Sequence, residues 1–211
     1  MTPSGLLLDL DGTLVDSEPL QRAAYRAFFT ARGWPAPDLS LFTGRRAEDV
    51  FATEPGPWTQ LAADLLAAEV RALVPRDVPP AAVPGARETV LAAAERRVPV
   101  AIVTSARPEW VAVAVDGLGL IDHIDLVVTA DDVVEGKPDP AGFLLACSRL
   151  GIEPDGALAV EDALAGVQAA RAAGIGRVVG VTTSRAAAEL TAAGAHTTYD
   201  DLRPVADLLR I

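Results

Sequence analysis

Two aspartates follow the first apolar stretch of the chain, in the segment "LLLDLDGTLVDS" (residues 6–17). Only one leucine separates Asp9 from Asp11. Carboxylates are costly to remove from water, and two close together repel each other unless a cation lies between or beside them. The pair therefore predicts that a positively charged group binds at the end of this stretch.

Three further groups of polar residues follow β-branched or apolar runs. They are Thr104 with Ser105 after "VAIV", Lys137 beyond "LVVT", and Glu161 with Asp162 after "ALAV". In open parallel sheets, ligands collect outside the carboxyl ends of the strands, so we expect all these groups to share one crevice. Clustered carboxylates, an ammonium and hydroxyls suit a divalent cation that prefers oxygen ligands, together with a phosphoryl group. We expect the cation to be Mg²⁺.

The elements that must position these groups alternate along the second half of the chain. Short strand-like runs at 98–104, 124–129, 157–162 and 176–182 are separated by helical patterns. This alternation is typical of an α/β protein with a parallel sheet. Asp139 and Gly151 are expected to begin and end one intervening helix. Asp162 has a competing interpretation as the N-cap of the next helix.

Residues 17–82 have a different pattern, with helical periodicity and Pro/Gly-rich joints but without strand-like runs. We call residues 17–82 the cap segment. The predicted organisation is a first strand and loop at 1–16, a helical cap at 17–82 and an α/β core at 83–211. Trp34, Phe42 and Trp58 are expected to form the cap's own hydrophobic core rather than a binding surface.

Four segments, "DLDGTLVDS", "IVTSA", "EGKPDP" and "VEDALAGVQAARAAG", resemble the ordered motifs of the haloacid dehalogenase superfamily. The likeness spans essentially the whole chain and is strongest to the branch of helical-cap sugar-phosphate phosphatases and β-phosphoglucomutase-like enzymes. It implies a Rossmann-like parallel sheet core with a small all-helical cap inserted after the first strand. It also implies a phosphoric monoester hydrolase that uses Mg²⁺.

The resemblance assigns four catalytic roles. Asp9 would attack phosphorus and become an aspartyl-phosphate, and Asp11 would protonate the leaving oxygen and then deprotonate the attacking water. Thr104 would bind the transferring phosphoryl group, and Lys137 would neutralise its charge and position Asp9.

The same resemblance implies the metal ligands and the supporting residues. The metal would bind Asp9, Asp162 and the backbone carbonyl of Asp11, with Glu161 either a direct ligand or a partner through water. The residues implied to support or bind the substrate are Gly12 and Thr13 at the turn after the strand, the backbone amides of Ser105 and Ala106, and Arg45 or Arg46 in the cap loop "TGRRAEDVF" (43–51). The two arginines could equally be part of an ordinary solvated helix start.

The predicted reaction is hydrolysis of a sugar phosphate, deoxysugar phosphate or glycerol phosphate. A phosphosugar mutase is the alternative, but the mutases carry a histidine at the position of Gln21, and glutamine is neither acid nor base. Dehalogenases of this family lack the second aspartate, present here as Asp11. Phosphonate hydrolysis would need a cap lysine, and residues 17–82 contain none. A non-catalytic binding module of the same fold remains a further alternative.

Composition limits the partners. The net charge of −11 and the pI near 4.6 disfavour a nucleic-acid or anionic-membrane surface. Cys147 is the only cysteine, so no internal disulfide can form, and we expect it to be a core residue. The amino terminus lacks a signal-peptide pattern, and charges interrupt every hydrophobic run before it could span a membrane. We therefore expect a soluble, cytoplasmic protein, a monomer or weak homodimer, that acts on a small phosphorylated metabolite.

Overall fold

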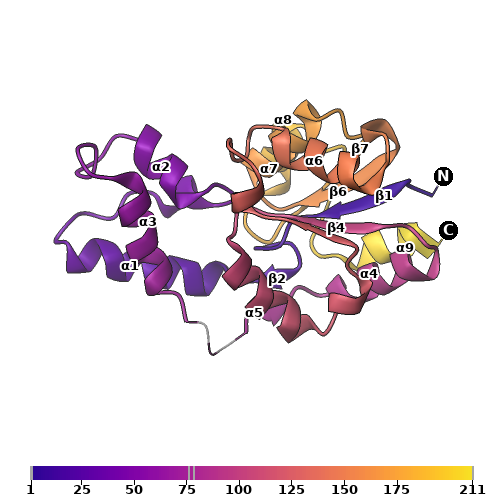
Figure 1. Cartoon of the computed structure of the whole chain (residues 1–211), viewed down its shortest axis with the longest axis horizontal. Coiled ribbons are helices and arrows are strands. Elements are labelled where there is room, and N and C mark those ends of the chain that lie inside the picture. The colour runs from indigo at the N-terminus through magenta and orange to yellow at the C-terminus, as the bar shows by residue number, and fades with distance from the viewer. Residues whose placement is uncertain (1, 76, 78, 211) are drawn as a thin grey trace.

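The computed structural model describes residues 2–75, 77 and 79–210 and is built around a six-stranded parallel sheet (Figure 1). The strand order is β5-β4-β1-β6-β7-β8. The strands are β1 (Gly5–Leu8), β4 (Val100–Val103), β5 (Leu126–Val128), β6 (Ala157–Glu161), β7 (Arg177–Val181) and β8 (Thr197–Tyr199). Every residue of β1 is buried, which matches its position in the middle of the sheet.

Helices cover both faces of this sheet (Figure 1). On one face lie α4 (Ala86–Glu95), α5 (Pro108–Leu118) and α9 (Arg203–Arg210), and on the other lie α6 (Ala141–Leu150), α7 (Leu164–Ala172) and α8 (Ala187–Ala193). Side chains alternate along a strand, so Leu6 and Leu8 pack into the first layer and Leu7 into the second. The predicted α/β fold with a parallel sheet is confirmed.

Each of the four strand-like runs contains a strand, but the sequence interpretation missed three others. It missed β8, which is short, only half-buried and at the sheet edge, so its residues lack a clear apolar pattern. It also missed a two-residue antiparallel pair, β2 (Val15–Asp16) with β3 (Ala81–Ala82). That pair brings the two ends of the cap segment side by side.

The cap segment contains three α-helices in its described part, α1 (Glu18–Ala31), α2 (Ala47–Thr53) and α3 (Ala63–Ala72). Figure 1 shows them in a group beside the sheet. Their apolar faces enclose a cluster rich in aromatic rings, in which Phe42 and Trp58 are buried and Trp34 packs at the edge. Phe51 and Trp58 stack edge to face with ring centroids 5.6 Å apart. The prediction that these rings belong to the cap's own core is confirmed for Trp34 and Trp58, whereas Phe42 belongs to the cluster and also lines the pocket described below.

Short 3₁₀ turns complete the described chain at Leu39–Phe42, Ile121–His123, Ala130–Asp132 and Pro154–Gly156. Helix α6 ends at Gly151 (φ +67°) as the sequence predicts. It begins one residue later than predicted, at Ala141 with Pro140 in the N-cap position, although Ala141 N–H still donates to Asp139 Oδ1 (2.9 Å). Cys147 is buried in this helix. Among the described helices, none combines the length and the apolar character needed to cross a bilayer.

Candidate active site

The predicted site residues meet where the carboxyl ends of three neighbouring strands come together. Asp9 follows β1, Thr104 follows β4, and Glu161 is the last residue of β6. Because β1 pairs with β4 on one side and β6 on the other, the connections diverge there and leave a crevice above the sheet.

Lys137 is buried between two carboxylates. Its ammonium donates to Asp9 Oδ1 (2.6 Å), Glu161 Oε1 (2.5 Å) and the carbonyl oxygen of Val103 (2.8 Å). Burial alone would lower the pKa of Lys137, but the charges and hydrogen bonds of Asp9 and Glu161 raise it, so the ammonium stays protonated. One fixed cation therefore orients Asp9 and partly offsets the clustered negative charge.

Asp162 lies beside this pair and is completely buried. Within the described residues, neither of its carboxylate oxygens accepts a hydrogen bond, and Glu161 Oε2 also lacks a donor. Burial, followed by the charges of Asp9 and Glu161, raises the pKa of Asp162. The alternative interpretation of Asp162 as a helix N-cap is wrong, because α7 is preceded by Ala163 and has no side-chain cap.

These unpaired oxygens fit a metal ion. Ligand atoms of Asp9, Glu161 and Asp162 lie within 4.8 Å of one another. Gly12 leaves room for them, because a Cβ at Gly12 would lie 2.0 Å from Asp162 Oδ2. An all-oxygen cluster of acids is the ligand set that Mg²⁺ prefers.

Asp11 points away from this cluster toward the cap segment. Its Oδ1 accepts hydrogen bonds from Ser17 Oγ (2.5 Å), Gln21 Nε2 (2.9 Å) and Trp110 Nε1 (2.8 Å). Burial is the main cause that raises the pKa of Asp11 to about 6. The negative charge of Asp9 also raises this pKa, whereas the three hydrogen bonds lower it. A carboxyl group with such a pKa can both give and take a proton near neutral pH.

Trp110 was missed at the sequence level, although a signal exists. A tryptophan in the first turn of the helix after "VTSARPE" needs a partner for its indole N–H, and Asp11 is that partner.

The loop after β4 contributes Thr104, Ser105 and Ala106 to the wall of the crevice. Ala106 N–H donates to Thr104 Oγ1 (3.0 Å), so this amide is engaged within the loop. Ser105 Oγ donates to the carbonyl oxygen of Gly44 (3.1 Å) and thus joins the core to the cap segment.

Gly12 and Thr13 lie behind the crevice rather than on its surface. Gly12 has φ +86°, a backbone conformation that favours glycine, and its carbonyl oxygen accepts from Thr183 Oγ1 (2.5 Å). The Thr13 side chain is buried.

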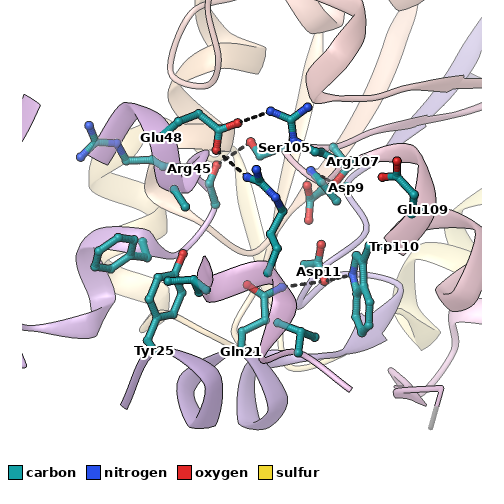
Figure 2. Close-up of a pocket in the computed structure, with 18 residues that line it drawn as sticks. Asp9, Asp11, Gln21, Tyr25, Arg45, Glu48, Ser105, Arg107, Glu109 and Trp110 are labelled. Carbon is teal, nitrogen blue, oxygen red and sulfur yellow. Dashed lines mark hydrogen bonds and ion pairs between the residues drawn. The ribbon is translucent and has the colours of Figure 1, made fainter. Parts of the chain in front are cut away.

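A pocket of ≈ 970 Å³, counted with its open mouth, extends from Asp9 and Asp11 to the cap segment. Figure 2 shows Tyr25, Arg45 and Glu48 on the cap side and Arg107 with Trp110 on the core side. The sequence interpretation did not single out Tyr25, Glu48 or Arg107. Glu48 lies within the cap loop "TGRRAEDVF" and Arg107 directly follows the "IVTSA" motif, but their contact depends on how the folded cap packs against the core.

The two cap arginines have different positions. Arg45 lines the pocket, although its guanidinium already pairs with Glu54 (2.7 Å). Arg46 lies outside the large pocket and donates to the carbonyl oxygens of Val134 (2.7 Å) and Val133 (3.3 Å) in the core. These contacts join the start of α2 to the core.

Comparison with known proteins identifies the family. A family described as "Hydrolase: haloacid dehalogenase-like hydrolase" matches residues 3–174. A "Validoxylamine A 7'-phosphate phosphatase" from Streptomyces hygroscopicus subsp. limoneus is 42% identical over 191 residues, covering 89% of each chain. "Fructose-1-phosphate phosphatase YqaB" from Escherichia coli K12 is 32% identical over 183 residues, covering 83% of this chain and 95% of the relative.

Among solved structures, a hydrolase from Pseudomonas syringae superposes with a TM-score of 0.84 at 28% identity, covering 97% of each chain. The ordered acids, the buried lysine and the sheet that positions them thus occur together with a family match over most of the sequence. The chain belongs to the haloacid dehalogenase-like hydrolases.

Proposed function

We propose that the protein is a Mg²⁺-dependent phosphatase that hydrolyses small phosphate monoesters through an aspartyl-phosphate on Asp9. The observation that carries this proposal is the contrast between the two aspartates. Asp9 is held by the Lys137 ammonium, whereas Asp11 has a pKa of about 6 and lies in the pocket that would receive the leaving group.

In the first half-reaction, a carboxylate oxygen of Asp9 attacks phosphorus and the bond from phosphorus to the ester oxygen breaks. Protonated Asp11 gives its proton to that departing oxygen. Lys137, from the loop after β5, and the Thr104 hydroxyl, after the end of β4, hold the phosphoryl oxygens.

In the second half-reaction, the Asp11 carboxylate takes a proton from water as the water oxygen attacks phosphorus. The acyl phosphate bond breaks, inorganic phosphate leaves, and Asp9 returns as a free carboxylate. Asp11 ends protonated, ready for the next ester, so one acid serves both steps.

The metal would be held by Asp9, Asp162 and the backbone carbonyl of Asp11, with Glu161 a direct or water-mediated partner. Bound Mg²⁺ supplies positive charge that reduces the repulsion between an anionic nucleophile and an anionic phosphoryl group. The two partnerless oxygens of Asp162 support this assignment.

Substrate and setting follow by analogy with the relatives, whose names include phosphatases of fructose 1-phosphate and of phosphoglycolate. We infer a small phosphorylated metabolite as substrate, residues 17–82 as a separate cap domain, and a cytoplasmic monomer or weak homodimer.

Phosphate release from p-nitrophenyl phosphate tests the proposal. We expect turnover with Mg²⁺, none with excess chelator, and loss of activity in Asp9→Asn, because the nucleophile becomes a neutral amide. The exposed residue Asp155 offers a matched control, since Asp155→Asn should leave turnover unchanged. Turnover that persists in Asp9→Asn would contradict the mechanism, and a lack of turnover in the unmodified protein would favour the binding-module alternative.

The mutase alternative needs its own assay. Gln21 donates to Asp11 Oδ1 and supplies no titratable group. With β-glucose 1-phosphate and its bisphosphate activator, we expect inorganic phosphate rather than glucose 6-phosphate. Accumulation of glucose 6-phosphate would overturn this choice.

A further inference from the structure

The pocket beyond Asp9 and Asp11 contains a network of paired charges (Figure 2). Glu48, on α2, accepts from Arg107 Nη2 of the core (2.8 Å) and from Arg71 Nη1 of α3 (3.2 Å). Arg107 also donates to Asp131 Oδ1 (2.8 Å). Both guanidinium groups thus already have carboxylate partners before any ligand binds.

Of the other two charged cap-side and core-side groups of the pocket, Arg45 is paired in the same way, whereas Glu109 is not. Arg45 donates to Glu54 Oε1 (2.7 Å) and to Thr53 Oγ1 (3.0 Å). Glu109 lines the pocket and has no cation within 4.0 Å among the residues described. A second anionic group on a substrate would therefore have to displace an existing ion pair and approach Glu48 and Glu109.

Groups that can bind a neutral, polar ligand are available. A carboxylate offers about four acceptor positions, so Glu48 keeps acceptor capacity after its two arginine contacts. Figure 2 shows the Tyr25 hydroxyl turned toward the pocket, and burial raises its pKa, so it remains a neutral donor and acceptor. Phe42, Val70 and Val74 supply apolar wall between these polar groups. This mixture suits a carbon skeleton that bears hydroxyl groups.

We propose that the pocket selects phosphate monoesters whose leaving group is uncharged and rich in hydroxyl groups, with Glu48 as the specificity-determining hydrogen-bond acceptor. This inference rests on the proposed phosphatase function and narrows it. It excludes, as preferred substrates, phosphorylated carboxylic acids and bisphosphates.

A panel of four esters tests the preference. Kinetic constants are measured for fructose 1-phosphate, sorbitol 6-phosphate, phosphoglycolate and fructose 1,6-bisphosphate, with p-nitrophenyl phosphate as the reference. Fructose 1-phosphate and sorbitol 6-phosphate have uncharged leaving groups rich in hydroxyl groups. We expect their kcat/KM to exceed that for phosphoglycolate and fructose 1,6-bisphosphate by about tenfold or more. A preference for phosphoglycolate or the bisphosphate would overturn the inference while leaving the phosphatase proposal intact, whereas failure to turn over any ester would refute the phosphatase proposal.

Two substitutions should move the preference in opposite directions. Glu48→Gln releases Arg71 and Arg107 from their common partner, so the ratio of kcat/KM for fructose 1-phosphate to that for phosphoglycolate should fall about tenfold or more. Arg71→Gln removes a cation and leaves Glu48 with more free acceptor capacity, so the same ratio should rise.

The matched control is Glu69→Gln, which also breaks an ion pair in the cap, because the exposed Glu69 on α3 pairs with Arg32 at the end of α1. Neither residue lines the pocket. It should leave the substrate ratio unchanged. A merely structural role for Glu48 would lower activity toward both esters together, and an unchanged ratio in both pocket variants would overturn the proposal.

Discussion

At the scale of single residues, the site shows how environment gives two nearby aspartates different chemistry. Asp9 accepts a hydrogen bond from the buried Lys137 ammonium, which holds its carboxylate in place. Asp11 is two residues further along, but its neighbours are a hydroxyl, an amide and an indole, all of them neutral. Without a cationic partner, burial dominates and raises its pKa.

Removal of the acid in Asp11→Asn should separate the two half-reactions. p-Nitrophenolate is a good leaving group and needs little protonation, whereas the attacking water still needs a base. We expect a burst of nitrophenolate close to one equivalent per enzyme, followed by turnover slowed by about 10²–10⁴-fold. Stopped-flow absorbance measures both phases. Loss of the burst together with the steady rate would show that Asp11 is required before the phosphoenzyme forms.

The clustering of Asp9, Thr104 and Glu161 could be predicted from the sequence, because each lies at the end of a recognisable strand. The direction of each side chain and its hydrogen-bond partners could not be predicted. Whether Asp162 capped a helix or joined the acidic cluster depended on the local turn, and Arg46 donates to core carbonyls that are 87 and 88 residues away in the sequence. Such long-range contacts have no local signature.

At the scale of elements, close backbone contact joins the cap segment to the core. Gly44 has φ +75°, and a Cβ there would lie 2.3 Å from the Cβ of Ala163, next to Asp162. The neighbouring contact from Ser105 to the Gly44 carbonyl strengthens the same junction. The absence of a side chain at this position therefore lets the cap approach the buried acidic cluster of Asp9, Glu161 and Asp162.

Gly44→Ala should hold the cap away from the core. We expect kcat/KM for a sugar phosphate to fall by at least tenfold, because a small misplacement of binding groups is costly to catalysis. Gly33→Ala is the matched control, since Gly33 also has positive φ (+64°) but nothing lies within 4 Å of its added Cβ. Both variants should lose similar thermal stability from backbone strain, measured as Tm. Equal loss of activity in the two would show that the junction does not matter.

Elements with strong apolar patterns, such as β1 and β4, could be placed from the sequence, whereas β2, β3 and β8 could not. The strands β2 and β3 are two residues long and are stabilised by pairing with each other across the whole cap segment rather than by their own composition. Strand β8 is at the edge of the sheet and is held there by pairing with a single strand, β7. Pairing partners, more than propensity, decide such strands.

At the scale of the whole molecule, the protein has separate hydrophobic clusters in its two parts. Two clusters cover the faces of the sheet, and a third, made largely of aromatic rings, lies within the cap segment. Two of the three tryptophans, Trp34 and Trp58, belong to the cap cluster. The parts can therefore differ in stability and be followed separately.

Phe51→Ala should weaken the cap alone. Phe51 is 2% exposed and contacts several rings, so its truncation should cost about 3–5 kcal/mol. During urea unfolding we expect tryptophan fluorescence to change at lower urea than the far-ultraviolet circular dichroism of the sheet and its helices. Superimposable transitions in this variant would show that cap and core unfold as one unit.

The β2–β3 pair also bears on how enzymes of this architecture can diversify. The chain leaves the sheet core at Asp16 and re-enters it at Ala81, and these two residues lie opposite each other. Because its two ends are paired, the inserted segment can change in length or sequence without moving apart the core residues on either side of it. A preference for a different leaving group can accordingly arise from substitutions within one contiguous segment, the cap segment, while the residues of the core that contact the phosphoryl group stay unchanged.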